Sequence, residues 1–160
     1  MAALSVCLSR AASRAISRLI KRLYALEGLE LPEAVDTIKA TVDPRCLEIV
    51  ADRLVRQLKV GDAEKRTKAA RVLELLGPVA ASQLVAHLRT SKDTAFRLRL
   101  VDVMIAIVPA AREQLALAFI GLVLYQPDEA LREAGWKGYE TLGPAGRGAG
   151  PRKVKSKPLQ

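Results

Sequence analysis

Apolar residues recur along most of this chain at spacings of three and four, which is the period of one face of an α-helix. The clearest run follows Asp62. Small or apolar residues stand seven, eight, eleven and fourteen positions later, at Ala69, Ala70, Leu73 and Leu76. Pro78 ends the run, because proline is not tolerated in a helix interior. The pattern predicts an α-helix that begins near Asp62 and ends before Pro78.

The same arrangement occurs three times without a gap, in segments 62–78, 93–109 and 128–144. Each segment begins with Asp, carries Arg four residues later and ends with Pro. The Asp and Arg positions are Asp62 and Arg66, Asp93 and Arg97, and Asp128 and Arg132. The matching apolar positions are Leu100, Val101, Met104 and Ile107 in the second copy, and Gly135, Trp136, Tyr139 and Leu142 in the third. Each Asp is placed to cap the start of its helix, because its carboxylate can accept from the free N–H groups there.

A second helical pattern follows the prolines. Its apolar positions are Val79, Leu84, Val85 and Leu88 after Pro78, and Leu115, Phe119, Leu122 and Val123 after Pro109; the residues Leu47, Val50, Leu54, Val55 and Leu58 share a face after Pro44. The steps Gly77-Pro78 and Gly143-Pro144 can end one helix and open the next. A unit of two helices cannot bury its apolar face alone, so the pattern predicts helical hairpins that stack on one another.

The motif Asp-x-x-x-Arg-x-x-Ala-Ala-x-x-Leu-x-x-Leu-Gly-Pro, complete at 62–78, resembles the HEAT-like repeat of the phycobilisome-lyase type. The resemblance covers residues 30–145 and implies an all-α fold, a short right-handed α-solenoid of about three to four hairpins. The second copy has Val108 in place of Gly, and the third has Gly135 and Trp136 where Ala is usual. Leu31 to Val42 is expected to form a degenerate terminal repeat. In this repeat type the recurring Arg pairs with an Asp, which makes it a scaffold residue; a ladder of phosphate contacts is the alternative.

The net charge of +9 is divided unevenly along the chain. Residues 1–26 hold five basic residues and no acid, namely Arg10, Arg14, Arg18, Lys21 and Arg22. Residues 147–160 also hold five and no acid, namely Arg147, Arg152, Lys153, Lys155 and Lys157. The part between them is close to neutral. If the chain contacts phosphate, the candidates therefore lie at the two ends: Arg10, Arg14, Arg18, Arg22, Arg152, Lys153, Lys155 and Lys157.

The two ends differ from the repeat domain, which we place at residues 27–145. Residues 1–26 carry Arg at every fourth position from Arg10 and an apolar stripe that includes Ile16 and Leu23, which predicts a basic amphipathic helix. This helix is interpreted as a cap on the first repeat, with a membrane or nucleic-acid contact and a transit peptide as alternatives. Residues 146–160 are rich in Gly and Pro and are expected to be disordered.

The sequence offers little material for catalysis. His87 is the single histidine, which excludes a multi-histidine metal site and argues against a Ser-His-Asp or Cys-His system. The paired His-Glu motifs of deoxyhypusine hydroxylase, an iron enzyme of similar repeat fold, do not occur, because Leu88 follows His87. A lyase-type repeat does not by itself imply lyase activity, since fold does not fix chemistry. We expect no enzyme, no metal and no cofactor, and a structural or surface role for His87.

The sequence therefore predicts a binding or adaptor module that engages a protein partner through its helical surface. The alternative is a nucleic-acid or ribonucleoprotein accessory factor that uses its basic ends. Trp136 and Tyr139 are the candidate partner contacts, because the last helix is expected to have no following helix to cover it. The longest stretches without a charged residue, 75–88 and 114–127, are shorter than a membrane span, so no transmembrane segment is expected. The expected location is the cytoplasm, or an organellar matrix if the first segment is a transit peptide.

Overall fold

The computed structural model describes residues 10–143, and within that range it contains seven α-helices and no strand. The prediction of an all-α fold is confirmed. The expected disordered tail, with Arg152, Lys153, Lys155 and Lys157, lies outside the described residues.

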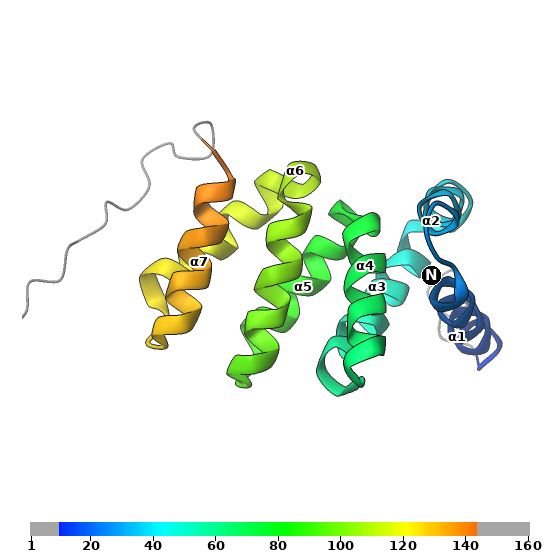
Figure 1. Cartoon of the computed structure of the whole chain (residues 1–160), viewed down its shortest axis with the longest axis horizontal. Coiled ribbons are helices and arrows are strands. Elements are labelled where there is room, and N and C mark those ends of the chain that lie inside the picture. Colours follow the sequence, from blue (N-terminus) through cyan, green and yellow to red (C-terminus); the bar gives the residue numbers. More distant parts are fainter. Residues whose placement is uncertain (1–9, 144–160) are drawn as a thin grey trace, which may run out of the picture.

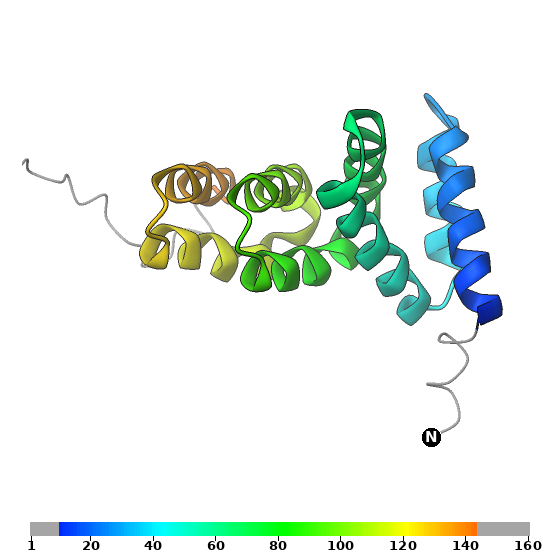
Figure 2. The same cartoon turned by 90° about the horizontal axis from the view of Figure 1, so that it is seen from below.

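The helices follow one another along the long axis of an elongated molecule, with α1 and α2 at one end and α7 at the other (Figure 1). They are α1 (Arg10–Ala25), α2 (Glu30–Thr41), α3 (Pro44–Val60), α4 (Ala63–Leu76), α5 (Pro78–Thr90), α6 (Thr94–Tyr125) and α7 (Glu129–Thr141). Figure 2 shows two rows: α3, α5 and the second half of α6 lie in one, and α4, the first half of α6 and α7 lie in the other.

The three repeated Asp residues cap helices as predicted. The carboxylates of Asp62, Asp93 and Asp128 accept from backbone N–H groups three residues later, at 2.8, 3.0 and 3.1 Å. The N–H of Lys65, followed by the Lys65 side chain, holds the pKa of Asp62 below its usual range. The Asp positions of the repeat therefore fix where α4, α6 and α7 begin.

The recurring Arg residues do not pair with these Asp carboxylates, so that expectation is wrong. The backbone N–H groups of Arg66, Arg97 and Arg132 donate to the Asp carbonyls, as in any first helical turn. No ion pair joins their guanidinium groups to a carboxylate in residues 10–143. A carboxylate that caps its own helix turns towards the third residue, and at Asp62 that residue is Lys65, whose Nζ lies 3.0 Å away.

The second repeated helix does not end before Pro109, as the sequence predicts. Pro109 lies inside α6, and the break falls at Ala111, whose φ of −130° and ψ of 26° are not helical. Pro109 is still part of the first half of α6, in the turn just before the break. The predicted hairpin is thus present as the two halves of α6, which lie in different rows (Figure 2).

Among the described helices, α6 is the one long and apolar enough to cross a membrane by length and composition. The break at Ala111 divides it, and 44% of its most apolar window is buried inside the protein. The absence of a transmembrane segment stays a prediction.

The apolar positions of the sequence pattern form one core. All five residues of the stripe after Pro44 are buried, and Phe96, Leu100, Met104 and Phe119 are 2% exposed or less. At the N-terminal end, Ile16 and Leu23 of α1 are buried against this core. The guanidinium of Arg53 on α3 donates to the Ser13 carbonyl at 3.0 Å and to the Ser13 and Ser17 hydroxyls at 2.6 and 2.8 Å. The basic helix is confirmed, and its packing favours the interpretation as a cap.

At the other end, α7 packs closely on the second half of α6. Gly135 and Gly138 are buried, and a Cβ atom at Gly135 would lie 2.6 Å from Cβ of Leu122. This approach leaves Tyr139 only 5% exposed, so Tyr139 offers almost no surface to a partner. Trp136 is half-buried and meets Tyr139 edge-on, with ring centroids 5.8 Å apart.

Candidate partner-binding groove

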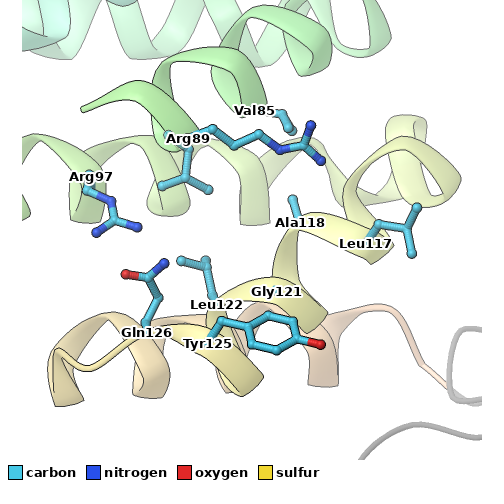
Figure 3. Close-up of a pocket in the computed structure, with 10 residues that line it drawn as sticks. Val85, Arg89, Arg97, Leu117, Ala118, Gly121, Leu122, Tyr125 and Gln126 are labelled. Atoms are coloured by element: carbon cyan, nitrogen blue, oxygen red, sulfur yellow. The ribbon is translucent and has the colours of Figure 1, made fainter. Parts of the chain in front are cut away.

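A groove of about 260 Å³ lies between α5 and both halves of α6 (Figure 3). The sequence places these helices side by side because Pro78 opens α5, Asp93 caps the start of α6 and the break at Ala111 turns the second half of α6 back. The lining residues are Val85, Leu88, Arg89, Arg97, Leu117, Ala118, Gly121, Leu122, Tyr125 and Gln126.

The second half of α6, which forms one wall of the groove through Leu117 and Tyr125, exposes several apolar side chains. Leu117 is 73% exposed, Leu124 is 49% exposed and Tyr125 is 79% exposed. With Gly121, they follow the three- and four-residue spacing of a single helix face. Three of the five large apolar side chains exposed within residues 10–143 are these neighbours on the second half of α6. Clustered exposed apolar side chains are more typical of binding surfaces than scattered ones are, which makes this face a candidate contact surface.

The groove also carries positive charge. Figure 3 shows Arg89 on α5 and Arg97 on the first half of α6, across the groove from Tyr125 and Gln126. None of the ten lining residues is acidic. Arg97 Nε is buried, and no residue in the described part of the chain accepts a hydrogen bond from it. A buried donor of this kind costs about 1–3 kcal/mol until an acceptor reaches it.

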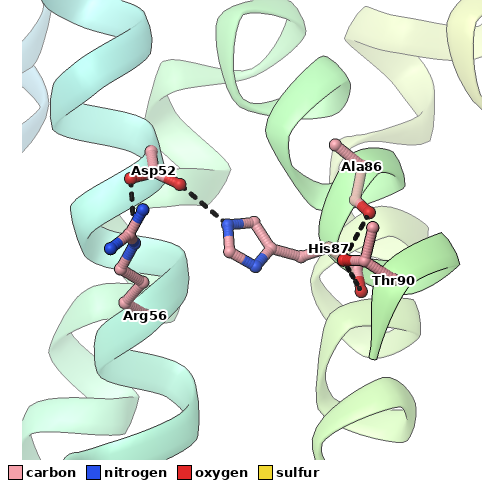
Figure 4. A network of polar contacts seen from close by, with 5 residues as sticks. All are labelled: Asp52, Arg56, Ala86, His87 and Thr90. Carbon is pink, nitrogen blue, oxygen red and sulfur yellow. Dashed lines mark hydrogen bonds and ion pairs between the residues drawn. The ribbon is translucent and has the colours of Figure 1, made fainter. Parts of the chain in front are cut away.

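A polar network fixes α5 beside this groove (Figure 4). His87 Nε2 lies 2.8 Å from Oδ1 of Asp52 on α3, and Oδ2 of Asp52 lies 3.0 Å from Nε of Arg56. The His87 ring also meets the Phe96 ring edge-on, with centroids 6.3 Å apart. His87 therefore has a satisfied structural role, as predicted. In residues 10–143 there is no cluster of three His, Cys, Asp or Glu side chains that could hold a metal.

The residues singled out from the sequence are spread over the molecule. Arg97 lines the groove, and Arg132 is exposed on α7. Arg66 lines a separate cavity beside Glu74 and Asp102. Trp136 is on α7, away from the groove lining.

Of the candidate phosphate contacts on α1, Arg14, Arg18 and Arg22 are exposed, and the side chain of Arg10 lies outside the described part.

Sequence reasoning missed Arg89, Leu117 and Tyr125. One signal was present in the stretch 114–127, which has more apolar residues than the single stripe of Leu115, Phe119, Leu122 and Val123 requires. Leu117 and Leu124 lie outside the buried stripe of this helix, where the fold does not require apolar side chains. The excess of apolar residues is the pattern expected of a helix with a second, exposed apolar face.

Comparison with protein-family models, with curated proteins and with solved structures gives no significant match to this chain.

Proposed function

We propose that this protein is a non-enzymatic adaptor, built as a short right-handed α-solenoid of HEAT-like hairpins, whose groove between α5 and α6 binds a segment of a protein partner. The gapless repeat and the two rows of helices in Figure 2 support the solenoid, since each hairpin then buries its apolar face against its neighbours. Tandem helical repeats present extended surfaces of this kind to their partners.

The groove selects for a particular partner chemistry. Leu117 and Tyr125 offer apolar contact, and Arg89 and Arg97 offer two guanidinium groups with no acidic residue in the lining. The matching partner is a short segment in which Asp or Glu stands beside apolar side chains. A carboxylate can accept two parallel bonds from one guanidinium, which gives such a segment a fixed orientation.

The observation that carries this proposal is the buried Nε of Arg97 beside an exposed apolar face. A structural Arg would be expected to satisfy its buried donor within the fold. Arg97 does not, and its side chain lines the groove beside Arg89.

The test uses two pairs of matched variants of the full chain as affinity bait, each with its fold checked by circular dichroism. Arg97→Glu changes the groove, and Arg132→Glu makes the same change at the equivalent repeat position on α7. Leu117→Ser and Leu29→Ser remove side chains that are 73% and 84% exposed, the second on the linker between α1 and α2.

The expected result is a protein partner that resists nuclease, persists with Arg132→Glu and Leu29→Ser, and is lost with Arg97→Glu and Leu117→Ser. Equal retention by all four variants contradicts the groove as the binding site. Loss of the partner on nuclease treatment alone contradicts protein recognition.

A further inference from the structure

A second concave site lies at the N-terminal end of the molecule, between α1, α3 and the start of α4. It encloses about 370 Å³. Four of its eight lining residues are cationic and none is acidic. The four are Lys21, Arg53, Arg56 and Lys65.

These positive charges are only partly compensated. Arg56 and Lys65 each have one carboxylate partner at 3.0 Å, Asp52 and Asp62. The guanidinium of Arg53 instead donates to the neutral oxygens of Ser13 and Ser17. Lys21 has no ion pair within residues 10–143 and is exposed. The pocket therefore keeps two uncompensated cations, Arg53, which the serines hold in place, and Lys21, which is exposed.

Tyr24 adds an unused donor to the same pocket. Its hydroxyl oxygen is buried and has no hydrogen-bond partner in the described part of the chain. Burial raises the pKa of Tyr24 to about 12, so the phenol keeps its proton at neutral pH. The hydroxyl can donate to an anionic oxygen in the pocket once the side chains that cover it move aside.

We propose that this pocket binds a backbone phosphate of a single-stranded nucleic acid. The anion is held by Lys21 and Arg53, and the rest of the strand follows the exposed face of α1. Arg18 and Arg14 stand three and seven residues before Lys21, so all three lie on the same side of the helix. One phosphate fills the pocket, and these arginines lie where the neighbouring phosphates of a flexible strand can reach them.

The packing of α1 favours nucleic acid over a membrane surface. A helix that lies on a bilayer inserts its apolar face. Ile16 and Leu23, on the apolar face of α1, are 6% and 3% exposed because they pack on the core. The exposed face of α1 is therefore basic, whereas its apolar face is buried against the core.

The experiment measures binding of the full-length protein to a fluorescein-labelled single-stranded oligouridylate by fluorescence anisotropy over a range of salt concentrations. Lys21→Gln removes the uncompensated rim charge. Lys137→Gln, an exposed lysine on α7 at the far end of the molecule, removes the same net charge and is the control.

Loss of one phosphate contact should reduce the slope of log affinity against log salt by about 0.7, which is about fivefold in affinity near 0.1 M salt. The variant carrying both Lys21→Gln and Arg18→Gln removes two of the proposed phosphate contacts and should lose about twice that slope. Lys137→Gln should bind like the wild type. Because α1 docks mainly through Ile16 and Leu23, Lys21→Gln should retain the wild-type melting temperature.

Three outcomes would overturn the proposal. The first is a Lys21→Gln variant that binds the oligonucleotide as Lys137→Gln does. The second is binding of inorganic phosphate that depends on Lys21 in a protein that does not bind the oligonucleotide, which would make the pocket a small-anion site. The third is a Lys21-dependent loss of binding to phosphatidylserine vesicles with oligonucleotide binding unchanged. None of these outcomes bears on the groove between α5 and α6, which is tested with other variants and another ligand.

Discussion

The contact between α6 and α7 makes a sharp prediction about two glycines. Gly138 lies on α7 against the ring of Phe119, and a Cβ atom built at Gly138 would overlap three atoms of that ring. Phe119 is fully buried, so its ring can move only by displacing the side chains packed around it. Gly121 lies on α6, where a Cβ atom would meet nothing within 4 Å. Both positions are inside helices, so Ala improves the local backbone preference equally at the two sites.

The sign of each effect follows from two opposed terms. Replacing Gly by Ala inside a helix contributes about 0.5–1 kcal/mol of stability. Overpacking a filled core costs about 1–3 kcal/mol. Gly121→Ala meets only the first term and should raise stability by about 0.5–1 kcal/mol. Gly138→Ala meets both, and the overlap with a ring packed inside the core makes the second term larger, so it should lower stability by about 1–2 kcal/mol.

The measurement is urea unfolding followed by circular dichroism at equal protein concentration for the wild type and both variants. The two variants should lie on opposite sides of the wild type. A Gly138→Ala variant as stable as Gly121→Ala would refute the close approach of α7 to Phe119. It would also remove the reason given for the burial of Tyr139.

Three further changes test other parts of the fold. Arg97→Met keeps the apolar stem but removes the unpaired buried Nε, so thermal melting should show stability equal to the wild type or higher by about 1 kcal/mol; a large loss would indicate a hidden partner. Asp52→Ala breaks the contacts to His87 and Arg56 and should cost about 1–2 kcal/mol in urea unfolding, whereas Asp36→Ala, at an exposed pair with Lys39, should cost nothing measurable. Burial raises the pKa of Tyr24, so the folded state keeps a phenol proton that the unfolded chain releases above its ordinary pKa of 10.0. The free energy of unfolding should therefore be independent of this group below pH 10 and fall as the pH rises towards 12. Tyr24→Phe should lack this part of the alkaline loss, and identical pH profiles for the two proteins would contradict the burial of the phenol.

Local signals in the sequence were sufficient to predict most helix starts. An Asp cap depends on a carboxylate and an N–H three residues later, so Asp62 sets the start of α4 whatever else packs on it. The end of a helix was equally predictable where glycine marks it. Gly77 has a φ of 57°, which lets α4 stop and α5 begin directly at Pro78.

The same reasoning failed at Pro109 for an identifiable cause. Val108 stands where the first copy has Gly77, and a β-branched residue is a genuine outlier at positive φ. The chain therefore cannot turn directly before the proline. It continues helical through Pro109 and bends at Ala111 instead.

Neither the groove nor the basic pocket could be predicted as a site, because each is formed by helices that are distant in sequence. Periodicity places a residue on a helix face, but it does not say which charges the neighbouring helices bring near it. In the sequence Arg53 does not differ from the other charged residues of α3, and only the fold shows that it contacts Ser13 and Ser17 of α1. Tyr139 was a candidate surface residue because the sequence does not show that two glycines let α7 approach α6.

The three repeated arginines show how packing gives one sequence position different roles. Arg66 shares its cavity with Glu74 and Asp102, so acidic side chains near it offset its charge. Arg132 is on the final helix of the described chain and is exposed to solvent, which screens it. Arg97 has no acidic side chain in the lining of its groove, which also holds Arg89, and its Nε is buried without an acceptor. The repeat therefore supplies the same guanidinium three times, and only in the central copy does the fold leave one that a partner's carboxylate would stabilise.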